Sequence, residues 1–136
     1  MHTVVERELE MRLVLAPEHS VAVPARLSYR TDDPYAVHVT FHITSETPVH
    51  WTFARELLME GVTQPCGDGD VRVWPTRVGT RKVVCMALSS PHGDALLEAD
   101  SPLLTAWLDR TLRVVPPGEE AEAMSLDAQL SALLQQ

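Results

Sequence analysis

Apolar and polar residues alternate along much of the first half of the chain, which is the pattern of β-strands with one buried face. The alternating runs are Leu9–Leu15, Val21–Tyr29, Val37–Ile43 and Val49–Phe53. Pro24 interrupts the second run, and because proline has no backbone N–H to donate, we expect an edge strand or a bulge there. The pattern therefore predicts four strands in this part of the chain.

The stretch from Val37 to Gly61 is the predicted centre of the fold, because two strand patterns, a turn and a helical pattern meet in it. The turn signal at Ser45–Pro48 joins its two strands into a hairpin. From Ala54 onward the apolar residues follow helical spacing, and Gly61 is placed as a C-terminal stop. These features predict a helix of about two turns over Ala54–Glu60.

Three further strands follow a polar loop at Thr63–Asp70. Val71–Trp74 alternates and is expected to end at Pro75, which cannot donate to a ladder. The unbroken apolar run within Lys82–Ser89 is typical of a central strand that is covered on both faces. Ala95–Ala99 is the last short strand, so the sheet is predicted to have about six or seven strands.

Helical spacing dominates the last third of the chain. Ser101 is expected to cap a helix whose first position is Pro102, and Trp107 is expected to pack on the sheet. The segment Pro116-Pro117-Gly118 stops this helix, because the prolines prevent its continuation and the glycine permits a sharp change of direction. We interpret this segment as an elbow and not as a linker between domains.

A terminal helix is predicted to begin at Ser125 and to carry one apolar face, made by Leu126, Leu130, Leu133 and Leu134. The chain beyond the elbow has no basic residue, and its acidic residues are Glu119, Glu120, Glu122 and Asp127. The sequence allows two placements of this terminal helix. The helix either folds onto the sheet of its own chain or docks on another subunit.

The composition fits a single domain over residues 1–136, long enough to bury roughly two thirds of its unfolded surface. Apolar residues make up 45% of the chain and charged residues 22%, and the apolar runs are too short for a membrane span. The N-terminus lacks the basic leader and apolar core of a signal peptide. We therefore expect a cytoplasmic protein without direct membrane insertion, in which Cys66 and Cys85 are free thiols.

Three groups of residues resemble chemical sites, and each has a simpler interpretation. His38, His42 and His50 share one face of the predicted hairpin, but alternation alone produces such a polar face, which we interpret as a surface or interface. Ser89–Asp94 holds serine, histidine and aspartate in one tight turn that cannot align a catalytic triad. Gly67–Asp70 lacks the P-loop lysine and the further ligands of a calcium loop. We predict neither an enzyme nor a metal or cofactor site.

The strongest alternative signal is a basic cluster with an interleaved aromatic residue, made by Arg72, Trp74, Arg77, Arg81 and Lys82. Such a cluster suits single-stranded nucleic acid, which binds by base stacking and phosphate contacts. The formal net charge of −8 opposes phosphate binding, and arginine on strand edges often only prevents aggregation. A single-stranded nucleic-acid-binding module is therefore the alternative function, with nucleic acid the less favoured partner.

Four long segments carry a family resemblance, namely DPYAVHVTFH at residues 33–42, WTFARELLMEG at 51–61, GDVRVWPTR at 69–77 and VVCMALSSPHGDALLEA at 83–99. Together with VPPG at residues 115–118, they closely resemble the SsgA-like sporulation and cell division proteins of actinomycetes. Their order and spacing match as well. The resemblance covers nearly the whole chain.

The resemblance implies a non-catalytic cell division regulator, without a cofactor, that acts in the cytoplasm at the septum. Its implied partners are the tubulin-like protein FtsZ, SsgA and other septum-associated division proteins, and its implied assembly is a homotrimer. The implied fold is α+β: a strongly bent, mostly antiparallel sheet with a short central helix and C-terminal helices, similar to Whirly-type single-strand binders. We predict partner contacts at the elbow and terminal helix, through Gly118, Glu119, Glu120, Leu130, Leu133 and Leu134.

Overall fold

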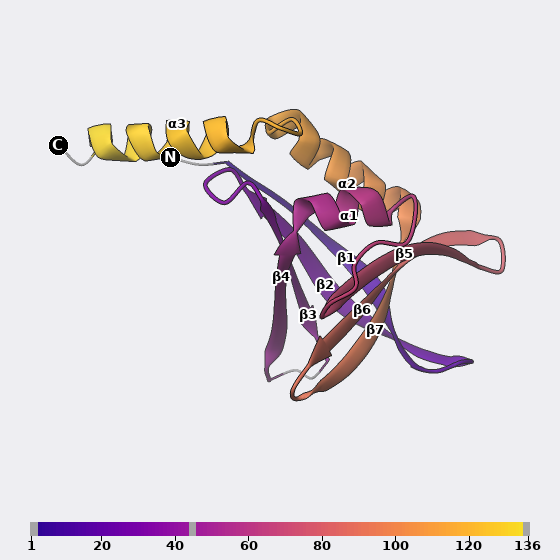
Figure 1. Cartoon of the computed structure of the whole chain (residues 1–136). Coiled ribbons are helices and arrows are strands. Elements are labelled where there is room, and N and C mark those ends of the chain that lie inside the picture. Colours follow the sequence, from indigo (N-terminus) through magenta and orange to yellow (C-terminus); the bar gives the residue numbers. More distant parts are fainter. Residues whose placement is uncertain (1–2, 44–45, 135–136) are drawn as a thin grey trace.

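The computed structural model of the chain describes residues 3–43 and 46–134 (Figure 1). Its elements are β1 (Val4–Ala16), β2 (His19–Arg30), β3 (Ala36–His42), β4 (Pro48–Ala54), α1 (Arg55–Gly61), β5 (Val71–Val78), β6 (Arg81–Ser90), β7 (Gly93–Asp100), α2 (Ser101–Val114) and α3 (Glu120–Leu134). Figure 1 shows α1 and α2 above a curled sheet, while α3 extends away from it.

The seven described strands form one sheet in the order β4-β3-β2-β1-β7-β6-β5, and every pairing between them is antiparallel. β1 and β2 pair along most of their length, whereas β1 meets β7 at two positions, where Arg12 faces Glu98 and Leu13 faces Leu97. Two meanders joined by this short seam curl into a half-barrel, as strand twist favours. The predicted bent antiparallel sheet is confirmed, and the likeness to Whirly-type proteins stays a prediction.

The central hairpin forms as predicted. β3 pairs with β4 from Ala36 opposite Ala54 to His42 opposite Pro48. Of the predicted turn at Ser45–Pro48, Ser45 lies outside the described residues. The alternation of the two strands therefore identified both the pairing partner and the buried face.

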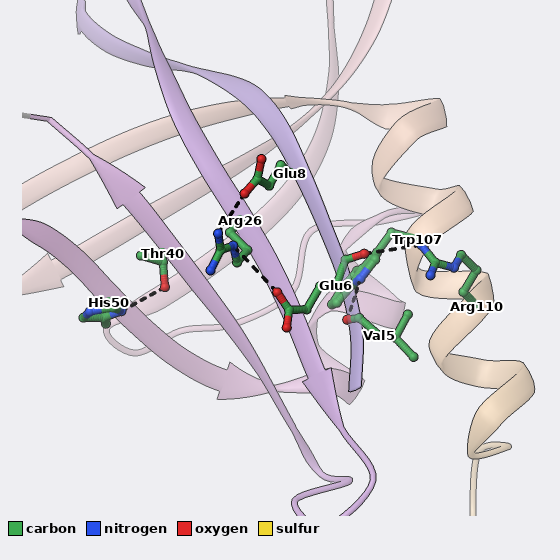
Figure 2. A network of polar contacts seen from close by, with 8 residues as sticks. All are labelled: Val5, Glu6, Glu8, Arg26, Thr40, His50, Trp107 and Arg110. Carbon is green, nitrogen blue, oxygen red and sulfur yellow. Dashed lines mark hydrogen bonds and ion pairs between the residues drawn. The ribbon is translucent and has the colours of Figure 1, made fainter. Parts of the chain in front are cut away.

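The core lies inside the curl and is closed by α2. Val83 to Met86 of β6 are buried on both faces of the strand, as predicted for a central strand. Trp107 is fully buried, and its Nε1–H donates to the carbonyl of Val5 at 3.1 Å. Arg110 reaches the carbonyl of the next residue of β1 at 3.4 Å, and both contacts are visible in Figure 2. The predicted packing of Trp107 on the sheet is confirmed.

The prediction of an edge strand or bulge at Pro24 is wrong. Pro24 lies in β2, between β1 and β3, and faces Glu10 of β1 in regular register. The irregularity of this pair of strands lies between Val14 and Ala16 instead. Pairing with β3 begins at Ala25, so Pro24 lies just outside the segment in which β2 has hydrogen-bonded neighbours on both sides.

The prediction that Pro75 ends its strand is also wrong. Pro75 faces Val84 of β6, and β5 continues to Val78. β5 is an edge strand, where a missing backbone N–H on the solvent side breaks no ladder bond. The position of a strand in the sheet, and not the proline itself, decides whether the strand can continue.

The N-cap of α2 is Asp100 and not Ser101. The Asp100 carboxylate accepts a hydrogen bond from the N–H of Leu103 at 3.1 Å, while Ser101 is already helical. Pro102 therefore occupies the second helical position and not the first. Asp is as good an N-cap as Ser, so the local sequence allows the helix to start after either residue. Because β7 ends at Asp100, the aspartate is the residue that caps the helix.

Gly61 is the last residue of α1. It does not have the positive φ of a glycine that follows a helix and ends it. The helix is capped by Val62, which has ordinary right-handed helical dihedral angles. A Cβ on Gly61 would overlap the side chain of Val73 on β5. The glycine is therefore required by the close approach of helix and strand, and the predicted helix is confirmed with its bounds shifted by one residue.

α3 begins at Glu120, five residues before the predicted start at Ser125. Its first turn contains Glu120 and Glu122, whose negative charges are favourable beside the N-terminal amides of a helix. The segment from Glu120 to Ala123 alternates glutamate and alanine. It has high helix propensity but no apolar periodicity, which is why the pattern missed it.

Replacing Gly61 by alanine is expected to lower the free energy of unfolding by about 1–3 kcal/mol, because the added methyl group meets the Val73 side chain. Urea unfolding followed by tryptophan fluorescence measures the change. Gly69→Ala is the matched control, since a Cβ at Gly69 meets nothing within 4 Å. Equal stability of the two variants would contradict the close packing of α1 on β5.

Candidate partner-binding surface

The elbow between α2 and α3 is the first part of the predicted partner site. Gly118 has a φ of +88°, a conformation that L side chains rarely adopt, which confirms the elbow. Its N–H donates to Oε1 of Glu120 at 2.6 Å. A Cβ at Gly118 would meet nothing within 4 Å, so the glycine serves the backbone conformation and not close packing. These few residues set the direction in which α3 leaves the domain.

A buried arginine holds the elbow against the domain. Arg55 of α1 is 1% exposed, and its Nη1 donates to the carbonyl of Thr111 near the C-terminal end of α2 at 3.0 Å. Its Nη2 lies 3.8 Å from Oε1 of Glu120, the first residue of α3. The guanidinium charge therefore faces both the negative end of a helix dipole and a carboxylate, which offset part of the cost of its burial, while Nη2 has no hydrogen-bond partner among the described residues. One side chain thus connects α1, α2 and α3.

The aromatic ring of Tyr29 supports the same arginine. The guanidinium carbon of Arg55 lies 4.7 Å from the centre of the ring, within the range of a cation–π interaction. The Tyr29 hydroxyl donates to the carbonyl of Pro34 at 2.9 Å. Burial raises the pKa of Tyr29 to about 12, against the opposing effect of Arg55, so the hydroxyl stays protonated at neutral pH.

Sequence reasoning missed Arg55, although the chain carries a signal for it. Arg55, Leu58 and Gly61 recur every three residues along α1 and are its buried residues. A charged residue on the buried face of a helix requires partners from elsewhere in the fold. The partners, Thr111 and Glu120, are too distant in sequence for a local pattern to identify.

α3 presents an uncovered apolar face. Leu126 is 58% exposed, Leu130 37%, and Leu133 and Leu134 65% each, and no described residue of α3 is buried. A groove of about 380 Å³ runs between α3 and the domain, lined by Thr3, Thr31, Val114, Val115, Ala123, Leu126, Asp127 and Leu130. α3 does not fold onto the sheet of its own chain, so docking on another molecule is the arrangement that stays a prediction.

The predicted partner-binding residues fall into two groups. Gly118, Glu119 and Glu120 form the elbow, where Glu120 turns inward to Arg55 and acts on the position of α3. The leucines among the predicted residues lie in the far half of α3, the last of them roughly 20 Å along the helix from Glu120. The elbow therefore sets the direction of α3, and a role of its exposed leucines in partner binding stays a prediction.

The outer face of β1–β4 is polar and hollowed. A cavity of about 720 Å³ on this face is lined by residues that include Glu8, Arg26 and His50. Figure 2 shows Arg26 between two carboxylates, at 2.7 Å from Glu8 and 3.7 Å from Glu6. These side chains are half exposed or more, so the ion pairs add little to stability.

The three histidines of the central hairpin lie on this outer face. His50 and Thr40 share a hydrogen bond of 2.8 Å, and His38 shares one of 3.0 Å with Thr52. His42 is exposed and lines the cavity. Within residues 3–43 and 46–134, no group of three histidine, cysteine or carboxylate side chains is arranged to hold a metal ion. The interpretation of these histidines as a polar surface is confirmed.

The register of β5 and β6 divides the predicted nucleic-acid cluster. Arg72, Trp74 and Arg81 lie on one face of the sheet, and Arg77 and Lys82 lie on the other. Arg81 also lines a small cavity with three carboxylates, those of Glu10, Glu98 and Asp100. The structure therefore does not bring the five residues together as one basic surface.

The remaining candidates for chemistry have structural roles. Cys66 and Cys85 are free thiols, as predicted. The hydrogen bond from the Cys66 thiol to Glu60, of 2.8 Å, raises the pKa of Cys66, and burial raises the pKa of Cys85 to about 11. Neither thiol is activated as a nucleophile. In the turn at Ser89–Asp94, the Ser90 hydroxyl donates to the backbone, which confirms a role in the turn.

The fold and this surface define a class of protein: an α+β half-barrel with a projecting helix whose apolar face is uncovered. In the part of the chain that the structure describes, no helix has the length and apolar character needed to cross a membrane.

Comparison with known proteins identifies the family. The family model described as "Streptomyces sporulation and cell division protein, SsgA" matches residues 23–120. The sporulation-specific cell division protein SsgB of Streptomyces coelicolor is 54% identical over 134 residues, which cover 98% of each chain. SsgB of Frankia casuarinae is 43% identical over 133 residues, covering 98% of this chain and 93% of that protein. The chain belongs to the SsgA family of sporulation and cell division proteins.

Two solved structures have the same fold. One comes from work described as "Mutations in SsgB correlate to longitudinal cell division during sporulation of Streptomyces coelicolor". It is 55% identical, with a TM-score of 0.88 and coverage of 90% of this chain and 97% of the other. The SsgA-like sporulation-specific cell division protein of Thermobifida fusca is 40% identical, with a TM-score of 0.85 and coverage of 96% and 95%. The expected fold is confirmed.

Removing the charge of Glu120 is expected to lower the free energy of unfolding by about 1–3 kcal/mol. Glu120→Gln keeps an oxygen for the N–H of Gly118 but removes the carboxylate that faces buried Arg55. Urea unfolding measures the loss, and the effect should shrink in an Arg55→Met background, where no buried charge needs compensation.

Glu119→Gln is the control for this prediction. Glu119 is the exposed neighbour of Glu120, and its carboxylate makes no ion pair or hydrogen bond with any described residue. We expect a change within about 0.5 kcal/mol. Equal losses for Glu119→Gln and Glu120→Gln would contradict the role assigned to the Arg55 contact.

Proposed function

We propose that this protein is a non-catalytic regulator of sporulation-specific cell division, which acts at the septum and recruits or organises the tubulin-like protein FtsZ. Membership of the SsgA family supports the role in cell division. SsgA and other septum-associated division proteins are its further partners. The protein works in the cytoplasm and is held at the septum by these contacts.

The observation that carries the proposal is the uncovered leucine face of α3. Four leucines at helical spacing stay exposed in an element that has no buried residue. An exposed apolar face of this kind marks a site of contact with another protein. The Arg55–Glu120 contact fixes the direction of the helix, which lowers the entropy cost of ordering it on binding.

Self-association is the second part of the proposal. A recruiter of a polymerising protein gains from several weak contacts made at once, because linked contacts raise the overall affinity without any new interaction. A homotrimer presents three equivalent FtsZ contacts to a filament. The leucine face and the elbow are therefore proposed as the protein-contact surface on which this assembly depends.

The double substitution Leu133→Glu and Leu134→Glu is expected to reduce co-sedimentation with FtsZ filaments by at least about tenfold, equivalent to about 1.4 kcal/mol. The two charges oppose burial of the leucine face against a protein partner. The measurement is the fraction of protein in the pellet at a fixed FtsZ concentration.

Leu15→Glu is the matched control, since Leu15 is 57% exposed and lies near the C-terminal end of β1, the end of this strand that Figure 1 shows away from α3. It should leave the pelleted fraction unchanged. Absence of the native protein from the FtsZ pellet would contradict direct recruitment, and equal pelleting of all variants would remove α3 from the contact surface.

The native chain is expected to sediment with three times the 15.1 kDa mass of one copy. Sedimentation equilibrium at the concentration of the FtsZ assay checks this. A single-chain mass under those conditions would contradict the multivalent mechanism, whatever the result of co-sedimentation.

A further inference from the structure

Two segments of this molecule carry charges of one sign only. Residues 71–93 contain four basic residues and no acidic residue, whereas residues 115–134 contain four acidic residues and no basic residue. The first segment forms the β5–β6 hairpin and the second forms the elbow and α3. Figure 1 shows the tip of this hairpin and α3 projecting in opposite directions. The chain therefore carries two complementary ends that do not meet within one copy.

The acidic residues of α3 border its leucine face. At the angular spacing of an α-helix, the exposed leucines fall within a stripe roughly 100° wide. Glu122 lies at one margin of the stripe and Asp127 at the other. A partner that covers this face must therefore be apolar in the middle and supply cationic donors beside it.

A groove beside the β5–β6 hairpin combines apolar and cationic side chains in this way. Its volume is about 320 Å³, and it is lined by Val62, Pro75, Thr76, Arg77, Lys82, Val83 and Ser101. We call it the basic groove, because its lining has two cations and no carboxylate. Arg77 and Lys82 are exposed and form no ion pair or hydrogen bond within residues 3–43 and 46–134. Their charges are available to a molecule that enters the groove.

The basic groove cannot be filled by α3 of the same chain. Ser101 in the groove lining begins α2, whereas α3 follows the opposite end of α2, roughly 20 Å away. The Arg55–Glu120 contact and the conformation of Gly118 direct α3 further from the groove. The complementary surface is therefore available to α3 only from another molecule.

We propose that α3 of one copy docks in the basic groove of a second copy of this chain. The leucine face covers Val62 and Pro75, while Glu122 and Asp127 face Arg77 and Lys82. This inference rests on the proposed self-association and names the partner of the α3 surface. The contact joins two different surfaces, so repeating it around a rotation axis closes a ring in which every helix and every groove is occupied.

Charge reversal tests the docking. A groove-reversed variant carries Arg77→Glu and Lys82→Glu, a helix-reversed variant carries Glu122→Lys and Asp127→Lys, and a combined variant carries all four substitutions. Each reversal alone places like charges together and should weaken self-association at least tenfold in sedimentation equilibrium. The combined variant restores opposite charges across the contact and should regain the native mass. Association of the native chain should weaken at 1 M salt, where the screening length falls to about 3 Å.

Glu18→Lys, in the exposed β1–β2 turn, is the control for a change of charge elsewhere and should keep the native mass. Far-ultraviolet circular dichroism checks that each variant is folded, and recovery in the combined variant separates a lost contact from a lost fold. If the groove-reversed variant does not fold, the helix-reversed variant still tests the contact, because its substitutions lie on a helix without buried residues.

The outcomes separate this inference from the proposed function. Native-like mass in both reversed variants, or no recovery in the combined variant, would overturn the docking while leaving self-association and FtsZ recruitment in place. Loss of FtsZ binding with unchanged mass in the helix-reversed variant would assign the α3 face to FtsZ and also overturn the docking. A monomeric native chain would contradict the proposed assembly itself.

Discussion

The buried guanidinium of Arg55 is the interaction on which the position of α3 depends. It joins the start of α1, the C-terminal end of α2 and the first residue of α3, which are far apart in the sequence. Without Glu120 the buried guanidinium would keep only the carbonyl of Thr111 and the ring of Tyr29 as partners, so the contact stabilises the elbow in its observed position. The direction of α3 is in this way coupled to the packing of the whole domain.

The rest of the structure follows from how the sheet is built. Two antiparallel meanders meet at a short seam between β1 and β7, and α2 closes the curl by inserting Trp107 against β1. This arrangement places β5 at an exposed edge and directs α3 away from it. A basic edge and an acidic, leucine-bearing helix are thereby held apart in one copy. Because of this separation, the helix and the basic edge cannot contact each other within one copy.

Much of the fold could be predicted, because alternation identifies half-buried strands wherever one face meets the core. The errors came from facts that local patterns do not contain. Pro24 and Pro75 are tolerated because of the order and extent of strand pairing, and Gly61 is required by a strand that follows it by ten residues. The leucine face and Gly118 were visible in the sequence. The spacing of Arg55 with Leu58 and Gly61 indicated its burial, but its partners could not be predicted, since they become neighbours only after the chain has folded.

Amide hydrogen exchange along α3 tests the central claim most directly, because an uncovered helix opens with a low free energy whereas a docked helix does not. We predict that α3 amides become protected as protein concentration rises, while amides of the β1–β2 turn do not change. Rapid exchange of α3 at every concentration, in the presence and absence of FtsZ, would contradict the assignment of this helix as a protein-contact surface.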